Sequence, residues 1–553
     1  MSKQFAARRG RGASVVLWFG LAVSTARAQP TPTPPALARE FRAAWISPTE
    51  GGDWPSRPGL SIDEQKFELA AILDRAKADG LNAVLLHVRT AADALYPTHR
   101  APWSRYLVGR DASSLGDYAG YDPLALAISE GHARGLQLHA WFNPFRAMPP
   151  DDLGKPIAGH VTSTHPEWVR HYGKSTWIDP GIPAARRAVL DAILEVVDRY
   201  DIDGVHLDDY FYPYQEEATV TRVVKHGKHR RRITRRVTLH FPDDVSWKRY
   251  GLARGWTDRD AWRRANIDDF VQTLYREVKA RKRWVLVGIS PFGIWRPGYP
   301  EGVTGLDSYA EIFADARRWL REGWVDYLAP QLYWPLENYQ QRFTKLDAWW
   351  RSENVRGRHL WPGLFTMRVG SRYDPWPAEE IAREVDALRA ARQGTTESLG
   401  HVHFRLGTFA ERLSAGDSAT FGDELRAQEY AEPALPPASP WLGAAQPARP
   451  LIDVPDDDPP LQNGSSGDGP ATSDGAHAVL VASPGDSVAV RWWMIQTFST
   501  DRRWRERLVR ADSPALALSA ADTLGAQWIA VTPISRTGVA GTPAIWGSRQ
   551  TDR

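Results

Sequence analysis

The sequence predicts an α/β fold, a (β/α)8 TIM barrel that is followed by a small all-β domain. Three observations lead to this prediction. Apolar runs alternate with helical patterns eight times between residues 40 and 430, several of these runs are apolar on both faces, and a Pro/Asp/Gly-rich stretch separates them from a segment of short strands. Strands that alternate with helices are typical of a parallel sheet covered by helices. A doubly wound open sheet is the alternative, but no G-x-G-x-x-G motif follows the first strand to support it.

The eight expected strands are short runs bounded by turn residues or helical patterns. They lie at residues 41–46, 82–88, 136–142, 205–208, 283–290, 324–329, 359–364 and 400–404. The helices are expected at residues 61–79, 122–135, 183–200, 261–280, 309–321, 336–350, 377–392 and 417–427. The first helix has the clearest bounds, because Ser61 and Glu64 have the spacing of a capping box and Gly80 ends it.

The fourth strand leads into the most distinctive motif of the chain, DIDGVHLDDYFYPY at residues 201–214. Alternation along a strand places His206 and Asp208 on the same face. Because a barrel carries its chemistry at the carboxyl ends of its strands, we expect Asp208 to face the site and Asp209 to point differently. The alternative is an Asp-Asp turn or cap with no catalytic role.

Other strand ends carry polar and aromatic residues that we expect to meet Asp208 and Asp209 at one rim. The candidates for binding substrate are Arg89, Asp93, His139, Asn143, Arg146, His206, Tyr210, Trp295, Gln331, Tyr333 and Trp334. For any single one, a structural role in a loop or the core is the alternative, so their convergence on one rim carries the argument. We expect no cofactor and no metal, because the strand histidines form no H-x-x-x-H pair.

Composition excludes several classes of function. The 69 basic and 66 acidic residues give a net charge of +3, so the charge of the whole chain does not indicate nucleic-acid binding. The chain has no cysteine, which excludes disulfides, thiol catalysis, Cys-based metal sites and lipid anchoring through an N-terminal Cys. The 25 Trp and 18 Tyr suit carbohydrate recognition, although most are expected to fill the core.

The two ends of the chain differ from the barrel in composition. Residues 1–28 have the basic region, apolar stretch and Ala-Arg-Ala site of an export signal, and a Pro/Thr-rich tether follows at 29–39. We therefore expect export to the periplasm or cell envelope, without a membrane span in the mature chain. Residues 431–475 have linker composition, and 476–553 resemble a small β-sandwich of the fibronectin or immunoglobulin type.

A basic hairpin interrupts the barrel pattern directly after the fourth strand. Residues 217–240 are expected to form two strands that turn at Gly227, and Lys or Arg recurs eight times between positions 222 and 236. Such a run attracts polyanions, and its position allows it to border the site. The alternative is a solvated insertion without a partner.

Several motifs in order resemble one known family. They include FRAAW at 41–45, DWPS at 53–56, DALYP at 93–97, GYDPL at 120–124, HAWFNPFR at 139–146, HPEW at 165–168 and DPG at 179–181. Together with residues 203–214, 290–295 and 324–334, they are similar to the glycosyl-hydrolase-like family ten over residues 40–406. The resemblance implies a (β/α)8 barrel, and implies glycan cleavage, because the family includes bacterial envelope enzymes that act on peptidoglycan strands stripped of their peptides. The hairpin and the end of the eighth strand, Phe404-Arg405-Leu406, depart from the family pattern.

The implied chemistry leaves several alternatives open. Glycoside hydrolysis commonly uses two carboxylates, and Asp208 is the best candidate for one, whereas Glu50, Asp53, Asp93 and Asp209 all remain candidates for the other. A substrate-assisted mechanism would use the acetamido oxygen of the sugar instead, with Gln331 and Tyr333 holding that group. Asp209 could instead orient Arg89 or Arg146, and Trp141, Trp295 and Trp334 could stack on sugars. A non-catalytic glycan-binding barrel and a hydrolase of a secreted exopolysaccharide are the alternative functions.

Overall fold

The computed structural model describes residues 33–49, 52–109, 120–148, 157–226, 229–412, 418–453, 480–482, 488–511, 515–518, 522 and 526–547. The expected export signal, Glu50 and the second half of the expected linker lie outside these residues. Within the described ranges, no helix combines the length and the apolar character needed to cross a membrane.

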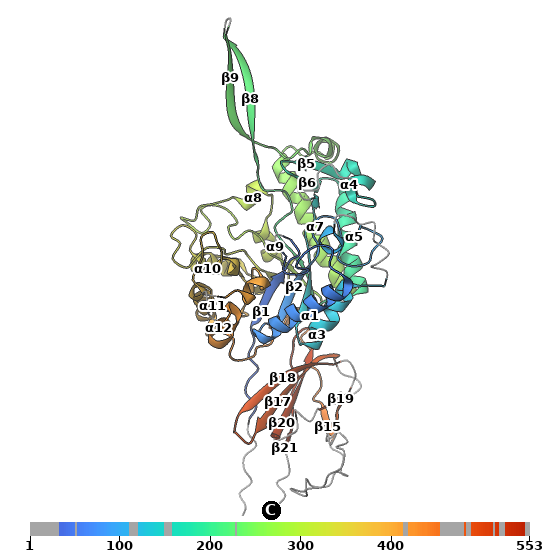
Figure 1. Ribbon diagram of the computed structural model, residues 1–553, viewed down its shortest axis with the longest axis vertical. Helices are drawn as coiled ribbons and strands as arrows, with labels where there is room; N and C mark the ends of the chain where they lie inside the picture. Colours follow the sequence, from blue (N-terminus) through green and yellow to red (C-terminus); the bar gives the residue numbers. More distant parts are fainter. Residues whose placement is uncertain are drawn as a thin grey trace, which may run out of the picture.

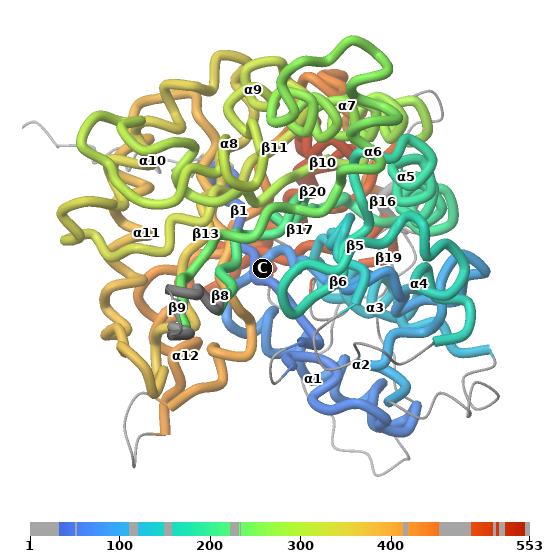
Figure 2. Tube along the Cα trace, turned by 90° about the horizontal axis from the view of Figure 1, so that it is seen from above, coloured from blue at the N-terminus to red at the C-terminus, as the bar shows by residue number. Residues whose placement is uncertain are grey.

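Nine parallel strands form the central sheet, which curls into a TIM-barrel-like fold (Figures 1 and 2). Their order is β12-β11-β10-β7-β3-β2-β1-β14-β13. The strands are β1 Phe41–Ile46, β2 Ala83–Arg89, β3 Gln137–Phe142, β7 Gly204–Leu207, β10 Leu286–Ile289, β11 Tyr327–Leu328, β12 His359–Leu360, β13 Gly363–Leu364 and β14 Gly400–His403. The two outermost strands of this order are the halves of the expected seventh strand, and only Trp361 and Pro362 separate them. One short segment of chain therefore links the two edges of the sheet.

Helices surround the sheet, as Figure 2 shows from above. The long ones are α1 Ile62–Ala78, α3 Pro123–Ala133, α5 Pro183–Arg199, α7 Arg259–Arg281, α10 Phe343–Glu353 and α11 Ala378–Arg392. The shorter ones are α2 Arg105–Val108, α4 Val161–Thr164, α6 Asp244–Ser246, α8 Ser308–Glu311, α9 Ala316–Glu322 and α12 Phe421–Gln428. The capping box of Ser61 and Glu64 is confirmed at the start of α1. The helix expected at 309–321 is instead two helices, because the side chain of Asp315 caps a new start at α9.

Two apolar layers hold the barrel together. One lies between the strands and the helices, and it includes the fully buried Val84, Val205 and Leu328. The other lies inside the barrel and contains large aromatic residues, among them Trp45 and Tyr327. Burial of this much apolar surface is the main stabilising contribution to such a fold.

The C-terminal part is antiparallel throughout its described residues. A four-stranded sheet has the order β18-β17-β20-β21, from β17 Val490–Ser499, β18 Trp504–Arg510, β20 Ala526–Ser535 and β21 Ala544–Gly547. A three-stranded sheet contains β15 Leu451–Asp453, β16 Leu480–Ala482 and β19 Ala515–Ala517. The strand β15 lies within the expected linker, so the linker contributes a strand to this sheet.

The C-terminal sheets adjoin the amino ends of the barrel strands, away from the carboxyl ends (Figure 1). Nη1 of Arg491 lies 2.6 Å from Asp201 Oδ2, and Nη2 lies 3.0 Å from Asp203 Oδ1. Both carboxylates precede β7, whose other end carries the Asp-Asp motif. The motif therefore contributes to both ends of the barrel. Asp201 and Asp203 bind the C-terminal part at one end, and Asp208 and Asp209 lie at the other.

Two further sheets lie at the carboxyl face. One has the order β4-β6-β5, from β4 Arg146–Met148, β5 Val169–Tyr172 and β6 Ser175–Ile178. The other is the expected hairpin, which pairs β8 Glu217–His226 with β9 His229–Thr238 and projects from the barrel (Figure 1). Its expected turning point at 227–228 lies outside the described residues.

Candidate functional site

A cavity of about 140 Å³ opens at the carboxyl ends of the barrel strands. Its lining comes from the ends of most of the central strands and the loops that follow them. The lining residues are Trp45, Ser47, Thr49, His87, Trp141, Asn143, Arg146, Asp208, Asp209, Tyr210, Tyr214, Ser290, Gln331, Tyr333 and Phe404. A concave site at this end of a barrel is where TIM-barrel enzymes carry their chemistry.

The structure brings seven of the thirteen site residues expected from the sequence to this cavity. They are Asn143, Arg146, Asp208, Asp209, Tyr210, Gln331 and Tyr333. Six of them lie in the segments that follow β3, β7 and β11, and Arg146 is the first residue of β4. The expected convergence of β3, β7 and the segment after β11 on one rim is therefore present in the structure.

Six expected residues do not line the cavity. Arg89 is the last residue of β2, and Asp93 lies in the loop after it, where it accepts hydrogen bonds from the backbone N–H groups of Thr90 (2.8 Å) and Ala91 (2.9 Å). Trp295 is buried, and its indole N–H donates to Asp315 Oδ1 at 3.0 Å. Trp334 packs edge-on against Phe292. These contacts support the loops behind the cavity wall, which is the structural role that the sequence left open as an alternative.

His139 and His206 lie one layer deeper, inside the barrel and fully buried. The indole N–H of Trp45 donates to His206 Nε2 at 3.1 Å, so Nδ1 of His206 carries the proton and donates to Tyr327 Oη at 2.9 Å. Tyr327 in turn donates to His139 Nδ1 at 2.9 Å. Burial lowers the pKa of His206 well below its usual value and that of His139 to about 4, so both rings stay neutral and fix the floor of the site.

Asp208 and Asp209 follow β7 and both line the cavity. Their hydrogen-bond partners differ, in keeping with the expectation that Asp209 points differently from Asp208. The strand β7 ends at Leu207, directly before the pair. The backbone N–H of Tyr210 donates to Asp208 Oδ1 at 3.2 Å, as in an Asx turn.

The two carboxyl groups have different environments. Asp208 Oδ2 is buried and has no hydrogen-bond partner among the described residues, whereas Asp209 Oδ2 accepts a hydrogen bond from the Tyr214 hydroxyl. Burial raises the pKa of Asp208 well above its usual value, and the charge of Asp209 raises it further. Burial also raises the pKa of Asp209, but the hydrogen bonds from Tyr214 and Gln331 act against that rise. Both pKa values are therefore raised, and the hydrogen bond from Tyr214 favours the ionised form of Asp209 at an oxygen whose counterpart in Asp208 has no such partner among the described residues.

Arg146 supplies the positive charge of the site. Its guanidinium lies 4.1 Å from the centre of the Tyr210 ring, a cation–π contact, and its charge lowers the pKa of both Asp208 and Asp209. Arg146 is half-buried and begins β4, the strand after the Asn143 turn. Of the two arginines that Asp209 was expected to orient, Arg146 lines the cavity and Arg89 does not.

Two of the residues expected as a second catalytic carboxylate, Asp53 and Asp93, do not face the cavity. Asp53 is buried, accepts hydrogen bonds from Ser47 N (2.8 Å) and Gly407 N (2.9 Å), and lies 3.6 Å from the Arg405 guanidinium. Asp93 holds its own loop, as described above. Among the described residues, Asp208 and Asp209 are therefore the carboxylates that face the cavity. Glu50 lies outside the described residues.

Seven lining residues were not among the residues expected to bind or cleave substrate. They are Trp45, Ser47, Thr49, His87, Tyr214, Ser290 and Phe404. His87 stacks on Trp141 with ring centres 3.8 Å apart, which makes Trp141, an expected stacking platform, part of a rigid wall. The signal for Trp45 and Phe404 was present in the sequence, because each lies at the end of an expected strand. Within the described ranges, no cluster of three His, Asp or Glu side chains suits a metal ion.

A TIM-barrel-like fold with buried carboxyl groups in a cavity at its carboxyl face is an architecture that glycoside hydrolases use. The sequence profile of the family described as glycosyl hydrolase-like 10 matches residues 40–376. The chain belongs to this family, and the resemblance found in the sequence is confirmed.

Two relatives agree with this assignment. Glycosyl hydrolase YngK of Bacillus subtilis (strain 168) is 37% identical over 424 residues, which cover 75% of this chain and 76% of the relative. Glycosyl hydrolase DigH of Escherichia coli (strain K12) is 30% identical over 407 residues, covering 69% and 86% respectively. The protein is thus a glycosyl hydrolase. Among solved structures, the glycoside hydrolase domain of PgaB (BpsB) from Bordetella bronchiseptica aligns with a TM-score of 0.41 at 15% identity, over 66% of this chain and 94% of that chain.

Proposed function

We propose that this glycosyl hydrolase is exported and cleaves the glycan strands of the bacterial cell wall, with peptide-free peptidoglycan as its polymer. Asp208 is the general acid that protonates the oxygen of the leaving sugar. One observation carries this role: Asp208 is buried at the cavity beside Asp209, and its Oδ2 has no hydrogen-bond partner among the described residues. A carboxyl group whose pKa is raised in this way keeps its proton near neutral pH and can donate it.

The second catalytic group is the substrate's own acetamido oxygen. Two carboxylates that serve as acid and nucleophile lie on opposite sides of the bond they cleave, about 5–5.5 Å apart. Asp208 and Asp209 are consecutive residues at one strand end, so they approach a sugar from the same side of the cavity. An N-acetyl group removes the need for a carboxylate on the other side, and peptidoglycan sugars carry such groups.

The remaining side chains have roles that follow from this arrangement. Asp209 accepts a hydrogen bond from the acetamido N–H, which pushes the acetamido oxygen toward the anomeric carbon. Gln331 and Tyr333 border the same part of the cavity and hold the acetamido group, while Asn143, Arg146 and Tyr210 bind sugar hydroxyls. The acetamido oxygen bonds to the anomeric carbon as the glycosidic bond breaks, and the Asp208 proton goes to the leaving oxygen. Water then attacks the anomeric carbon and returns a proton to Asp208, while the bond from that carbon to the acetamido oxygen breaks and restores the N-acetyl group.

Export is proposed from the sequence of residues 1–28, which has the three parts of an export signal. An enzyme that acts on cell-wall glycan needs to reach it outside the cytoplasm. Detection of the mature chain in the envelope fraction, cleaved after Ala28, supports this part of the proposal. A chain that retains residues 1–28 in the cytoplasm would contradict it.

The substrate is tested by comparing three polymers: peptidoglycan treated with an amidase, the same polymer after chemical removal of its N-acetyl groups, and an N-acetylated exopolysaccharide. We expect soluble fragments from the first polymer alone. Release from the de-N-acetylated polymer at an unchanged rate would contradict the substrate-assisted mechanism. Faster release from the exopolysaccharide would replace peptidoglycan as the substrate.

A further inference from the structure

The hairpin of β8 and β9, here called the arm (residues 217–238), has no role in the site described above. It contains eight Lys or Arg residues and one Glu, a net charge of +7. The whole chain has a net charge of +3, so the residues outside the arm together carry −4. The excess positive charge of the protein is therefore concentrated in one two-stranded element.

The register of the arm distributes these charges over both of its faces. Directly opposed residues of an antiparallel pair lie on the same face. By this register Arg232 and Arg236 lie on one face, and Arg235, opposite Val220, lies on the other. The side chains of Arg232, Arg235 and Arg236 are exposed, so both faces present cations to solvent.

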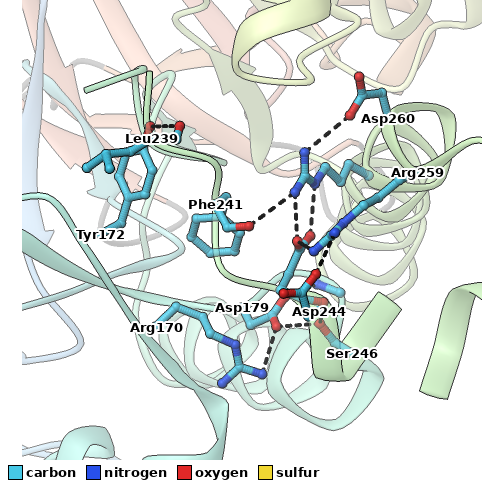
Figure 3. A network of polar contacts seen from close by, with 12 residues as sticks. Arg170, Tyr172, Asp179, Leu239, Phe241, Asp244, Ser246, Arg259 and Asp260 are labelled. Atoms are coloured by element: carbon cyan, nitrogen blue, oxygen red, sulfur yellow. Dashed lines mark hydrogen bonds and ion pairs between the residues drawn. The ribbon is translucent and has the colours of Figure 1, made fainter. Parts of the chain in front are cut away.

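Contacts at its base hold the arm in a fixed position (Figure 3). The Tyr172 hydroxyl accepts a hydrogen bond from Glu216 N and donates one to Leu239 O, both at 3.0 Å, so one side chain joins the two ends of the hairpin. The chain that leaves β9 is held at Phe241 O by Arg263 Nη2 at 3.3 Å. Asp243 then binds Arg263 through both carboxylate oxygens, at 2.6 and 2.8 Å.

The same network extends to the neighbouring barrel loop. Asp179, which precedes α5, accepts a hydrogen bond from Ser246 Oγ at 2.6 Å and lies 2.9 Å from Arg170 Nη2. Asp179 is fully buried, and Arg170 belongs to β5, the strand that also carries Tyr172. The base of the arm is thus built into the carboxyl face of the barrel.

The arm is also continuous with the wall of the cavity. Only Gln215 and Glu216 separate Tyr214, which binds Asp209, from the first residue of β8. Ten residues of antiparallel strand extend about 34 Å. A polymer that enters the cavity therefore has a cationic strand pair of this length available next to the catalytic pair.

We propose that the arm is a docking element for a glycan whose sugars carry free carboxylates, and that it holds such a strand while the neighbouring cavity cleaves it. This inference rests on the proposed function for the identity of the polymer. When a peptide is removed from its sugar by hydrolysis of the amide bond, a carboxylate remains on that sugar. A peptide-free strand is therefore a polyanion along its length, and the arm is complementary to it in charge.

The observations favour a polyanionic strand over a lipid surface as the partner. An element that lies on a bilayer separates an apolar face, usually with Trp, Phe or Leu, from a cationic one. In the arm both faces carry cations, and residues 217–238 contain no Trp, Tyr, Phe or Leu. A strand with charges on both sides can instead follow a flexible polymer along either face.

The test compares two forms of one polymer. Amidase-treated peptidoglycan is used as it is, and after carbodiimide coupling to a neutral amine, which converts its carboxylates to uncharged amides. The variant R232Q/R235Q/R236Q removes the three arm charges whose side chains are exposed. The matched control R502Q/R503Q/R505Q removes three exposed charges from the C-terminal part. On the carboxylated polymer at low salt, we expect the arm variant to raise KM about tenfold with kcat unchanged, because steering and screening by charge act on association.

On the amidated polymer, the wild type and the arm variant are expected to have the same KM, and the control variant is expected to match the wild type throughout. Equal KM values for wild type and arm variant on the carboxylated polymer would overturn the proposal. The proposal would also be overturned if the wild type but not the arm variant cosedimented with vesicles of phosphatidylglycerol while the two had the same KM. That result would show that the arm binds a lipid surface.

A separate measurement distinguishes failure of this inference from failure of the proposed function. Retention of the wild type and each variant on immobilised polymer, carboxylated or amidated, measures binding independently of cleavage. If the wild type cleaves neither polymer, the proposed substrate is wrong. Loss of retention in the arm variant, on the carboxylated form alone, would still support the arm as a docking element. Equal retention on both forms would overturn it.

Discussion

The hydroxyl group of Tyr214 donates a hydrogen bond to Oδ2 of Asp209. The neighbouring Asp208 has no such donor at its own Oδ2 among the described residues. Two consecutive carboxyl groups in one cavity are thereby made unequal, since the Tyr214 hydroxyl stabilises the anion of Asp209 and no side-chain hydroxyl does so for Asp208 among the described residues. This inequality is the physical basis of the roles proposed for them.

Replacement of Tyr214 by Phe tests the role of this hydrogen bond. Its loss raises the pKa of Asp209, because the hydrogen bond favours the ionised form. A group that acts as an anion is active above its pKa, so the acidic limb of the profile of kcat/KM against pH is expected to move to higher pH. The measurement is that profile with a soluble glycan oligomer. An unchanged acidic limb would show that Asp209 does not work in its ionised form.

Replacement of Asp209 by Asn tests the effect of the Asp209 charge on the pKa of Asp208. The charge of Asp209 is, after burial, the second cause of the raised pKa of Asp208. Its removal lowers the pKa of Asp208, which donates its proton only below that pKa. We expect the residual activity of Asp209→Asn to be lost at lower pH than that of the wild type. A shift of the alkaline limb to higher pH would contradict the assignment of Asp208 as the acid.

Replacement of Asp208 by Asn is expected to raise the free energy of unfolding at neutral pH, although it lowers activity. A carboxyl group whose folded pKa lies above its unfolded value of about 4 destabilises the folded state as pH rises above that value. Asp208→Asn removes this effect, so its Tm at pH 7 is expected to exceed that of the wild type by a few degrees. Differential scanning calorimetry of both proteins makes the comparison.

Asp93→Asn is the matched control for this stability measurement. Burial raises the pKa of Asp93, but hydrogen bonds from Ser104, Ala91 and Thr90 together lower it below its usual value. The carboxylate therefore stabilises the fold above its unfolded pKa, and Asp93→Asn is expected to lower Tm. If both variants change Tm in the same direction, the two aspartates do not differ in the way described here.

The barrel could be predicted because its signals are local. Each central strand is a short apolar run, and the helix starts have recognisable caps, such as Ser61 and Asp122. The seventh strand was expected as one run, and the structure divides it around Trp361 and Pro362, because its first half pairs with β11 and its second half with β14. Which neighbour a residue pairs with depends on the closure of the sheet, which a local pattern does not contain.

The site could be predicted in part, for a related reason. Alternation placed His206 and Asp208 on the inner side of the barrel, but it did not show how far each lies from the carboxyl end. His206 lies beneath the cavity, in contact with Trp45 and Tyr327. Alternation also stops where β7 ends, so the pattern could not identify the partners of Asp209. Tyr214 follows in a loop whose path depends on the base of the arm, so its contact with Asp209 required the structure.

The most direct test of the account is the rate at which soluble fragments leave amidase-treated peptidoglycan in the presence of wild type, Asp208→Asn and Asp63→Asn. Asp63 lies in the exposed first turn of α1 and serves as the matched control. If Asp208 protonates the leaving sugar, Asp208→Asn lowers the rate by about 10²–10⁴ while Asp63→Asn leaves it unchanged. A rate for Asp208→Asn within about twofold of the wild type, well short of the contribution of a general acid, would contradict the account.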